Sequence, residues 1–443
     1  MTVPTAPEAS NKPTISASET TQQTQSAKQS RQSKQPQRKH DRLITRDMAL
    51  VMLATFCFMS SNMLANPIVA GYAESLGASG MLMGVVAGSM SFISLFCRPI
   101  AGNLSDKTSK RTLVAVGTVL YFAAGLLYYF ANSPTMLIMA RVINGVGFAC
   151  CSVCLATWMS LLLPIRHMGA GMGLYGTMNA LAMAVGPALG IRAQKYIGYR
   201  LTFLSSLVLA AIMLIATLMV KNGGQPVRKK QTSTTENPSA AVDIDGSAGA
   251  TKKHLFSIRS ILEPRVVPLS LTFMMFAIAY FANQSFIMNY IEARHLPVSA
   301  DLFFMFYAVA LLVLRLGLRD LFDSKGFRFW LTVCSLGMLA MLACMTFLFN
   351  DWMLLLAAIF TAVGYGLMSS VTQAQAVVIA GRERSGIANS TYYAGIDLGM
   401  SAGPFVGGLV YGRLSAVWFY PVFMLTMPVA WLIYLLCVRR VSR

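Results

Sequence analysis

Four charged residues stand inside long apolar stretches of this 443-residue chain, where charge is otherwise scarce. One is an acid, Asp397, and the others are the bases Arg98, Arg141 and Arg315. Ionisable side chains within a membrane are costly and mark proton relays or substrate paths. We therefore expect Asp397 and Arg141 to couple the protein to protons. The alternatives are a neutral acid that only hydrogen-bonds a neighbour, and an arginine that reaches towards the membrane surface.

The stretches that carry these residues have the length and composition of membrane-spanning helices. Only 12% of the residues are charged, about half the share in a soluble protein. Spanning the hydrocarbon takes about 20 apolar residues in a helix, whereas barrel strands are about half as long and alternate in polarity. We predict an all-α membrane protein with twelve transmembrane helices. Their expected extents are 47–72, 81–103, 112–131, 135–163, 169–192, 201–220, 268–292, 300–318, 329–348, 352–380, 385–412 and 415–438.

The remaining segments set the domain organisation. Residues 1–46 are rich in Ser, Thr, Gln and Lys and lack an apolar run, so we predict a disordered tail. Residues 221–267 have the composition of a flexible linker, and 439–443 form a short second tail. The linker divides the helices into an N-terminal six-helix bundle, 47–220, and a C-terminal six-helix bundle, 268–438.

The basic residues indicate an orientation. Of the 36 Lys and Arg residues, 28 fall in the tails, the linker and the loops of one side, and 5 fall in the loops of the other side. Cytoplasmic segments carry the excess of basic residues, so we expect both termini in the cytoplasm and the protein in the cell (inner) membrane. Nucleic-acid binding is not expected, because it would gather the net charge of +19 on one face of a domain.

Enzyme chemistry is not expected from the sequence. We find no nucleophile–base pair and no phosphate-binding lysine loop. All eight cysteines fall in apolar segments, and the cluster Cys150, Cys151 and Cys154 lacks a second ligand pair. Small buried hydrophobic residues are the better interpretation of these cysteines. We therefore expect no enzymatic activity, no metal and no cofactor.

The two halves repeat each other at an offset of 217 residues. One offset relates four helix pairs, and it relates charged residues as well as glycine and proline. Such internal repeats build a central site between two halves that rock against each other. The related pairs are Arg98 and Arg315, Asp106 and Asp323, Arg111 and Arg328, Asn66 and Asn283, Gly186-Pro187 and Gly403-Pro404, and Gly190 and Gly407.

The segment from Arg98 to Arg111, RPIAGNLSDKTSKR, resembles the loop signature between helices 2 and 3 of the major facilitator superfamily. Ser109 stands where that family usually has glycine, and Arg319 replaces a glycine in the second copy. The resemblance implies two pseudo-symmetric six-helix bundles and alternating access. It also implies that Asp106 faces the positive start of helix 11 in the other half. We expect a conformational latch formed by Arg98, Asp106, Arg111, Arg315, Asp323 and Arg328; the alternative for Asp106 is a solvated loop acid.

Two further motifs point to the same family. Arg141 with Gly145 and Gly147 resembles its helix 4 motif, and helix 5 resembles its antiporter motif, with Ala182 where glycine is usual. This implies the drug:proton antiporter branch. Ordinary close packing of small residues is the alternative, since helix 11 repeats the pattern. The glycines and prolines concerned are Gly173, Gly186, Pro187, Gly190, Gly399, Gly403, Pro404 and Gly407.

Neutral polar residues within the helices are expected to line a cavity. With 29 methionines and many aromatic residues, that cavity would be apolar and adaptable, which suits lipophilic or amphipathic cargo. Each polar residue could instead bridge two helices. The candidates are Asn62, Asn66, Asn179, Asn283, Gln284, Gln373, Gln375, Asn389, Tyr392 and Tyr393.

These features predict a secondary active transporter that moves a small molecule by alternating access, as proton-coupled efflux. A proton-coupled importer of a nutrient or metabolite would use the same fold, because function resides in the site. A membrane receptor without transport is a third interpretation, opposed by the loop signature in both halves. The expected partners are a small-molecule substrate, protons and the lipid bilayer, and we expect a monomer.

Overall fold

The computed structural model describes residues 45–163, 168–225, 262–318, 321, 325–381 and 384–438, which consist of helices joined by turns and loops, without a strand. The predicted all-α fold is confirmed for these residues. The predicted tail 1–46 lies outside them apart from its last two residues, as do 439–443 and the middle of the predicted linker.

The first half contains five long helices in the order of the chain. They are α2 (Arg46–Ser75), α3 (Gly80–Lys107), α4 (Lys110–Phe130), α5 (Pro134–Leu162) and α6 (Met168–Met219). The predicted helices 169–192 and 201–220 are joined in α6, whose backbone breaks at Gly198 with φ 76° and ψ 173°. Only glycine adopts that conformation without a steric penalty. The break therefore gives α6 two arms, 168–197 and 199–219.

The second half is more interrupted than the first. Its elements are α8 (Val267–Ala293), α9 (Ala300–Gly317), α11 (Phe327–Thr346), α12 (Asp351–Thr361), the π-helix η2 (Ala362–Leu367), α13 (Met368–Ala380), α14 (Ser385–Arg413), the 3-10 helix η4 (Ala416–Trp418), α15 (Phe419–Met424), α16 (Thr426–Ile433) and the π-helix η5 (Tyr434–Val438). The predicted helix 352–380 thus contains a π-helical turn in its middle. Such turns are rare, and they occur frequently at functional sites.

Local sequence signals begin several of these helices. The Ser133 hydroxyl accepts a hydrogen bond from the Met136 N–H, and Pro134 occupies the first helical position of α5. Asn350 Oδ1 accepts from the Met353 N–H at 2.9 Å before α12. Side-chain oxygens at this position satisfy N–H groups that have no partner within the helix. These caps are encoded by two or three neighbouring residues.

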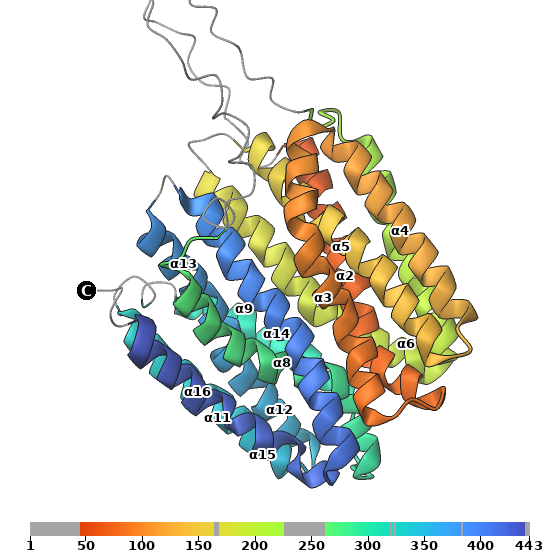
Figure 1. The fold of residues 1–443 in the computed structure, drawn as a ribbon, viewed down its shortest axis with the longest axis vertical. Coiled ribbons are helices and arrows are strands. Elements are labelled where there is room, and N and C mark those ends of the chain that lie inside the picture. The colour runs from red at the N-terminus through yellow and green to blue at the C-terminus, as the bar shows by residue number, and fades with distance from the viewer. Residues whose placement is uncertain are drawn as a thin grey trace, which may run out of the picture. The chain divides into compact units, whose positions relative to one another are not determined.

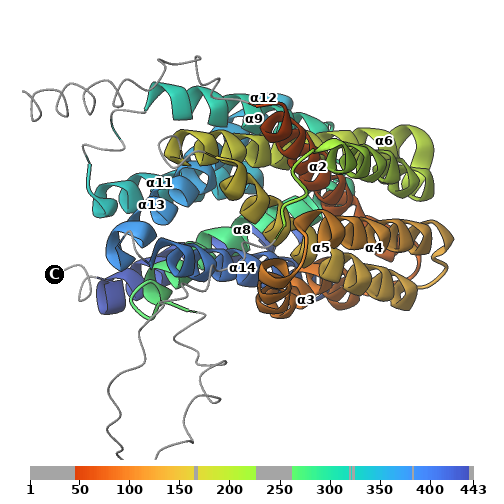
Figure 2. The same cartoon turned by 90° about the horizontal axis from the view of Figure 1, so that it is seen from above.

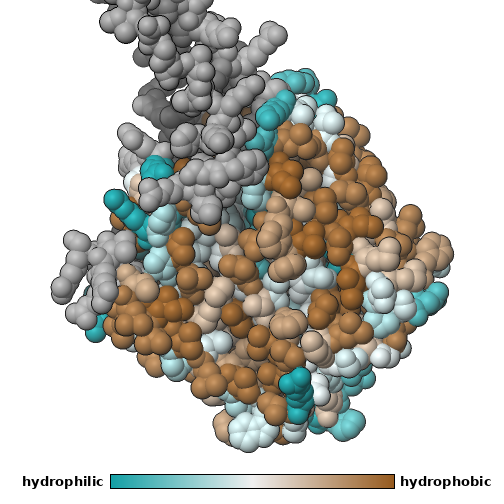
Figure 3. Space-filling model, viewed as in Figure 1, coloured by the Kyte–Doolittle hydropathy of each residue, from teal (hydrophilic) through white to brown (hydrophobic). Residues whose placement is uncertain are grey.

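The helices have the surface of a membrane protein. Within the described residues, nine helices are long and apolar enough to cross a membrane. Many large apolar side chains are exposed, and hydrophobic residues make up most of the face that Figure 3 draws, with small and polar residues between them. Soluble monomers rarely expose apolar patches of more than a few hundred Å². We conclude that this face contacts lipid.

The two halves meet along three helix pairs. Helix α3 packs against α14, α6 against α9, and α2 against α8, and α3 and α14 lie side by side in both ribbon views (Figures 1 and 2). We call the end where α2 begins and α6 finishes the linker end, and the end where α3 begins and α14 finishes the far end. At the linker end, Trp158 Nε1 donates to Asn222 O at 2.9 Å and Ser109 Oγ donates to Gly223 O at 2.7 Å. The first residues of the predicted linker are therefore fixed to the first half.

Candidate functional site

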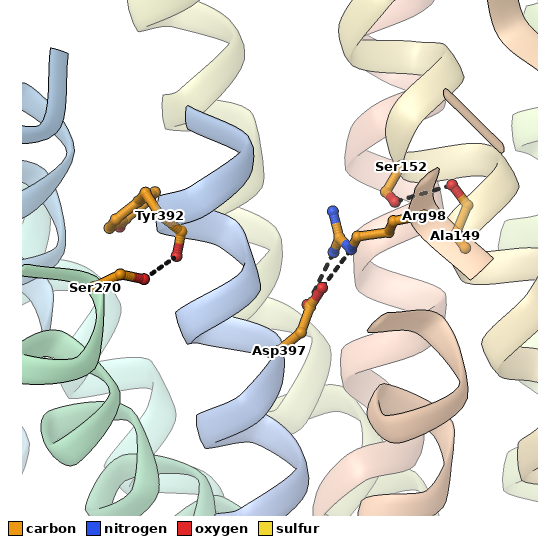
Figure 4. Close-up of polar contacts among 6 residues, drawn as sticks. All are labelled: Arg98, Ala149, Ser152, Ser270, Tyr392 and Asp397. Atoms are coloured by element: carbon orange, nitrogen blue, oxygen red, sulfur yellow. Dashed lines mark hydrogen bonds and ion pairs between the residues drawn. The ribbon is translucent and has the colours of Figure 1, made fainter. Parts of the chain in front are cut away.

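A buried ion pair joins the two halves. Arg98 in α3 donates from Nη2 to Oδ1 of Asp397 in α14 at 3.0 Å, and its Nε lies against Oδ2 of the same carboxylate (Figure 4). The Asp397 side chain is 1% exposed and that of Arg98 is 21% exposed. The guanidinium also lies over the rings of Phe148 and Tyr393, at 5.5 and 5.9 Å from their centroids. Arg98, which was expected in a latch, therefore neutralises Asp397, the acid expected to couple the protein to protons.

Close contact between two helix backbones positions this pair. An added Cβ at Gly84 would lie 2.5 Å from Pro404 O, and one at Gly88 would lie 2.6 Å from Ser401 O. Glycine is required because any side chain at these points would meet backbone atoms of α14. The approach extends from the far end to Arg98 and Asp397. Gly80, Gly84 and Gly88 were not among the predicted site residues, although their spacing of four residues is evident in the sequence.

Arg141 is also buried, but neutral groups surround it. Its two terminal nitrogens donate to Oδ1 of Asn66, both at 3.2 Å, and its Nε donates to Val86 O at 3.2 Å. Further contacts go to Ala87 O and to Met90 Sδ. The carboxylates that form ion pairs in the described residues bind other arginines. Arg141 therefore ties α5 to α2 and α3, and Asn66, a predicted cavity residue, is its partner.

The other expected latch residues are not brought together. Arg111 donates to Val220 O at the end of α6, within its own half. Arg328 is exposed at the start of α11. Arg315 forms none of the ion pairs of the described residues, and its buried Nε has no hydrogen-bond partner there. The side chain of Asp106 and the whole of Asp323 lie outside the described part of the chain.

Three of the predicted cavity residues are fully buried, Asn62 in α2 and Asn283 and Gln284 in α8. Neither amide atom of Asn62 has a hydrogen-bond partner among the described residues, nor has Asn283 Nδ2 or Gln284 Oε1. Asn283 Oδ1 accepts from the hydroxyl of Tyr420 at 2.9 Å, and Gln284 Nε2 lies 3.7 Å from Met63 Sδ. Buried polar atoms almost always have partners. This group could therefore bind the polar part of a ligand.

The remaining predicted cavity residues are partly or fully exposed, except Tyr392, which is buried. Gln373 Nε2 donates to Asn389 Oδ1 at 3.1 Å, which ties α13 to α14. The Tyr392 hydroxyl donates to Ser369 O at 2.9 Å, and Ser270 Oγ reaches the Tyr392 carbonyl at 3.5 Å (Figure 4). The others lie apart from these pairs: Gln375 is half-buried, Tyr393 is exposed, and Asn179 donates to Tyr175 O within its own helix.

A second contact between the halves lies at the far end. The Glu74 carboxylate of α2 accepts hydrogen bonds from Asn289 of α8 and from the hydroxyl of Tyr411 of α14, the latter at 3.3 Å. Arg192 and Asp301 form an exposed pair between α6 and α9 at 3.7 Å. The sequence analysis assigned no role at this contact, because charged residues at helix ends are ordinary there.

The sequence matches the profile of the Major Facilitator Superfamily over residues 51–351 and 323–443. The chain belongs to this superfamily. The resemblance seen in the loop signature is thereby confirmed at the level of the superfamily, and this member is a secondary transporter. The antiporter branch stays a prediction.

Relatives of this superfamily member differ in sequence identity and in how much of the chain they match. An uncharacterised MFS-type transporter of Methanocaldococcus jannaschii is 22% identical over 84% of this chain and 92% of its own length. An SPX domain-containing membrane protein of Arabidopsis thaliana is 33% identical, but the match covers 37% of this chain and 24% of the plant protein. The chain thus spans about a quarter of that relative.

Solved structures share the fold of this superfamily member. A nucleoside transporter, NupG, superposes with a TM-score of 0.67 at 13% identity and covers 88% of this chain and 99% of its own. A POT family transporter in complex with a thioalcohol-conjugated peptide gives 0.70 at 11% identity, covering 90% and 97%. At such identities the likeness concerns the fold alone.

Within this fold, the glycines of the predicted antiporter motif pack each half internally. A Cβ at Gly186 of α6 would lie 2.7 Å from Met63 Cβ of α2, and one at Gly403 of α14 would lie 2.6 Å from Ile278 O of α8. The pattern is the same in both halves, so helix packing explains it. Gly190 lies against Leu64, Gly399 against Ala277 and Gly407 against Phe286, while Gly173 and Pro187 lie in α6 and Pro404 in α14.

Proposed function

We propose that this superfamily member is a proton-coupled transporter that exports a small lipophilic or amphipathic molecule by alternating access. The Arg98–Asp397 pair carries the proposal. Among the ion pairs of the described residues, it alone joins the two halves through a carboxylate that is 1% exposed. Breaking a buried pair by removing one charge destabilises the contact by several kcal/mol, about 3–5.

A proton could therefore control the contact between the halves. Protonation of Asp397 removes the charge that holds Arg98, which loosens α3 from α14. Loss of the proton restores the pair and draws the halves together. The contacts between α3 and α14 lie towards the far end, so this conformation is closed at that end. Arg141 supports the step by fixing α3 against α5, rather than by exchanging a proton.

The proposal includes the topology predicted from the sequence. In the described part of the chain, nine helices satisfy length and hydropathy together. The two arms of α6 count as two spans, and α9 and α14 span as well despite their charged and polar residues, which gives twelve. We place the protein in the cell membrane, with the linker end and both termini on the cytoplasmic side, because 28 of the 36 basic residues belong to that side. The far end then faces outwards, and a monomer suffices.

Inside-out vesicles with an imposed pH gradient test this function. The probes are tetraphenylphosphonium, benzamide and phenyl phosphate, each radiolabelled. We expect wild-type vesicles to concentrate at least one probe when the gradient is present. Asp397→Asn, which keeps the size of the side chain but not its titration, should abolish the accumulation. Glu292→Gln is the control, because Glu292 is an exposed acid at the end of α8. Accumulation that survives Asp397→Asn would rule out this coupling site.

A further inference from the structure

Arg315 faces the interior of the second half. It follows Leu311 by four residues and Tyr307 by eight, and both of these are buried. Val309 and Val313, on other faces of α9, are exposed to the lipid side. Residues four apart lie on the same helix face, so the Arg315 side chain extends along the buried face of α9. An arginine that only reached for the membrane surface would not need this face.

Tyrosines gather in the same interior. Tyr307 lies on the buried face of α9, with its ring centroid 5.8 Å from that of Tyr280, and Phe273 lies 5.5 Å from the ring centroids of both Tyr365 and Tyr392. Tyr365 belongs to the π-helical turn η2, and its ring stacks on that of Tyr280 with centroids 4.0 Å apart. Aromatic walls with hydroxyl groups offer both an apolar contact surface and hydrogen bonds. The surroundings suit a molecule with a flat apolar part.

An acid for Arg315 is missing from the described residues. Its Nε is buried without a hydrogen-bond partner, and none of the three ion pairs includes it. The buried carboxylate of Asp397 is already engaged by Arg98. A partly buried cation that lacks a counter-charge is stabilised when an anion binds beside it.

The internal repeat indicates the position from which an acid would reach Arg315. The offset of 217 residues relates Arg98 to Arg315, Tyr175 to Tyr392, and Asp397 to Ala180. The structure preserves the packing that these relations require, because α9 packs on α6 as α3 packs on α14. Arg98 meets an acid across the halves, whereas the equivalent position for Arg315 holds the methyl group of Ala180.

We propose that the cargo supplies this acid: Arg315 binds the anionic group of an amphipathic cargo, a carboxylate or a phosphate, at the position that Ala180 leaves open. A guanidinium matches both groups with two parallel hydrogen bonds. The rings of Tyr307, Tyr365 and Tyr392 hold the apolar part. This inference rests on the proposed transport function and narrows its cargo to anions.

Binding to the purified full-length protein tests the inference. Titration calorimetry would compare benzoate and phenyl phosphate with benzamide, which has the same ring without the charge. We expect wild type to bind at least one of the two anions at least tenfold more tightly than benzamide. Arg315→Gln should remove this preference. Arg328→Gln is the matched control, because it deletes the same charge at an exposed position of α11.

A second variant adds the acid instead of removing the base. Ala180→Asp should pair with Arg315 as Asp397 pairs with Arg98, and it should abolish the preference for anions. Ala180→Asn, of equal size but neutral, should retain a preference that Ala180→Asp loses. If Arg315→Gln does not fold, this comparison decides the question. The tighter anion of the two identifies the cargo as a carboxylate or a phosphate.

Three results would overturn the inference: no preference for either anion in wild type, an unchanged preference in Arg315→Gln, or an unchanged preference in Ala180→Asp. These results are distinguishable from a failure of the proposed function. Gradient-driven accumulation of benzamide or tetraphenylphosphonium without anion binding would reject only the inference. Anion binding that depends on Arg315, without accumulation of any probe, would support the inference and reject proton-coupled export.

Discussion

The contact between α3 and α14 can be opened by adding one methyl group. In Gly84→Ala, the new Cβ would lie 2.5 Å from Pro404 O, 3.0 Å from Gly408 Cα and 3.1 Å from Phe405 O. Ordinary contacts of this kind begin at 3.4 Å, so the two backbones must separate by about 1 Å. All three neighbours are backbone atoms, and no side-chain rotation relieves the overlap. We expect the substitution to disfavour this conformation.

The expected size of the effect follows from overpacking. Extra methyl or methylene groups in a close-packed contact destabilise it by about 1–3 kcal/mol. A bias of that size shifts the ratio of two conformations by about fivefold to 150-fold. The far end should therefore open in a measurable fraction of molecules. Gly176→Ala is the matched control, since Gly176 lies in α6 and has no atom within 4 Å of an added Cβ.

Double electron–electron resonance detects this opening, because it measures the distance between two spin labels. Ser75 in α2 and Ala293 in α8 are exposed at the far end, one in each half. With cysteines at these two positions in a background without the eight native ones, Gly84→Ala should add a longer distance to the distribution, and Gly176→Ala should not. Identical distributions for wild type and Gly84→Ala would refute the argument that this glycine contact holds the far end closed.

Three smaller perturbations test other contacts. Glu74→Ala releases Asn289 and Tyr411. It should lengthen the distance between the labels less than Gly84→Ala does, because exposed polar contacts contribute little. An unchanged distance would show that the glycines alone close this end. Arg141→Met leaves buried acceptors unpaired at about 1–3 kcal/mol each and should lower the Tm in detergent by several degrees, whereas an unchanged Tm would contradict its role as a tie. Trp158→Phe removes one hydrogen bond to Asn222, worth about 1 kcal/mol, and should speed trypsin cleavage after Lys221 about fivefold. A cleavage rate equal to that of wild type would show that this hydrogen bond does not hold the start of the linker.

The positions of the helices and their repetition were predictable from the amino-acid sequence alone. The length of each apolar run sets where a helix can lie in a bilayer, and this is a local property. The predicted bounds therefore agree with α2 to α5 within a few residues. The loop signature indicated the superfamily because it is a short run of neighbouring residues. The 217-residue offset supported it because the same residue types recur in both halves. The joining of two predicted helices in α6 escaped prediction, because it depends on the conformation of the single residue Gly198.

The partners of the charged residues became apparent only from the packing of the helices. Sequence position gives the depth of Arg98, Arg141 and Asp397 in the membrane, but not which neighbour each helix face meets. Arg98 and Asp397 are 299 positions apart, and their pairing depends on the close approach of α3 and α14. Arg141 received neutral partners because α5 presents it to the carbonyl groups of α3. Apolar composition carries no information about rotation around a helix axis, and that rotation is fixed by packing between helices.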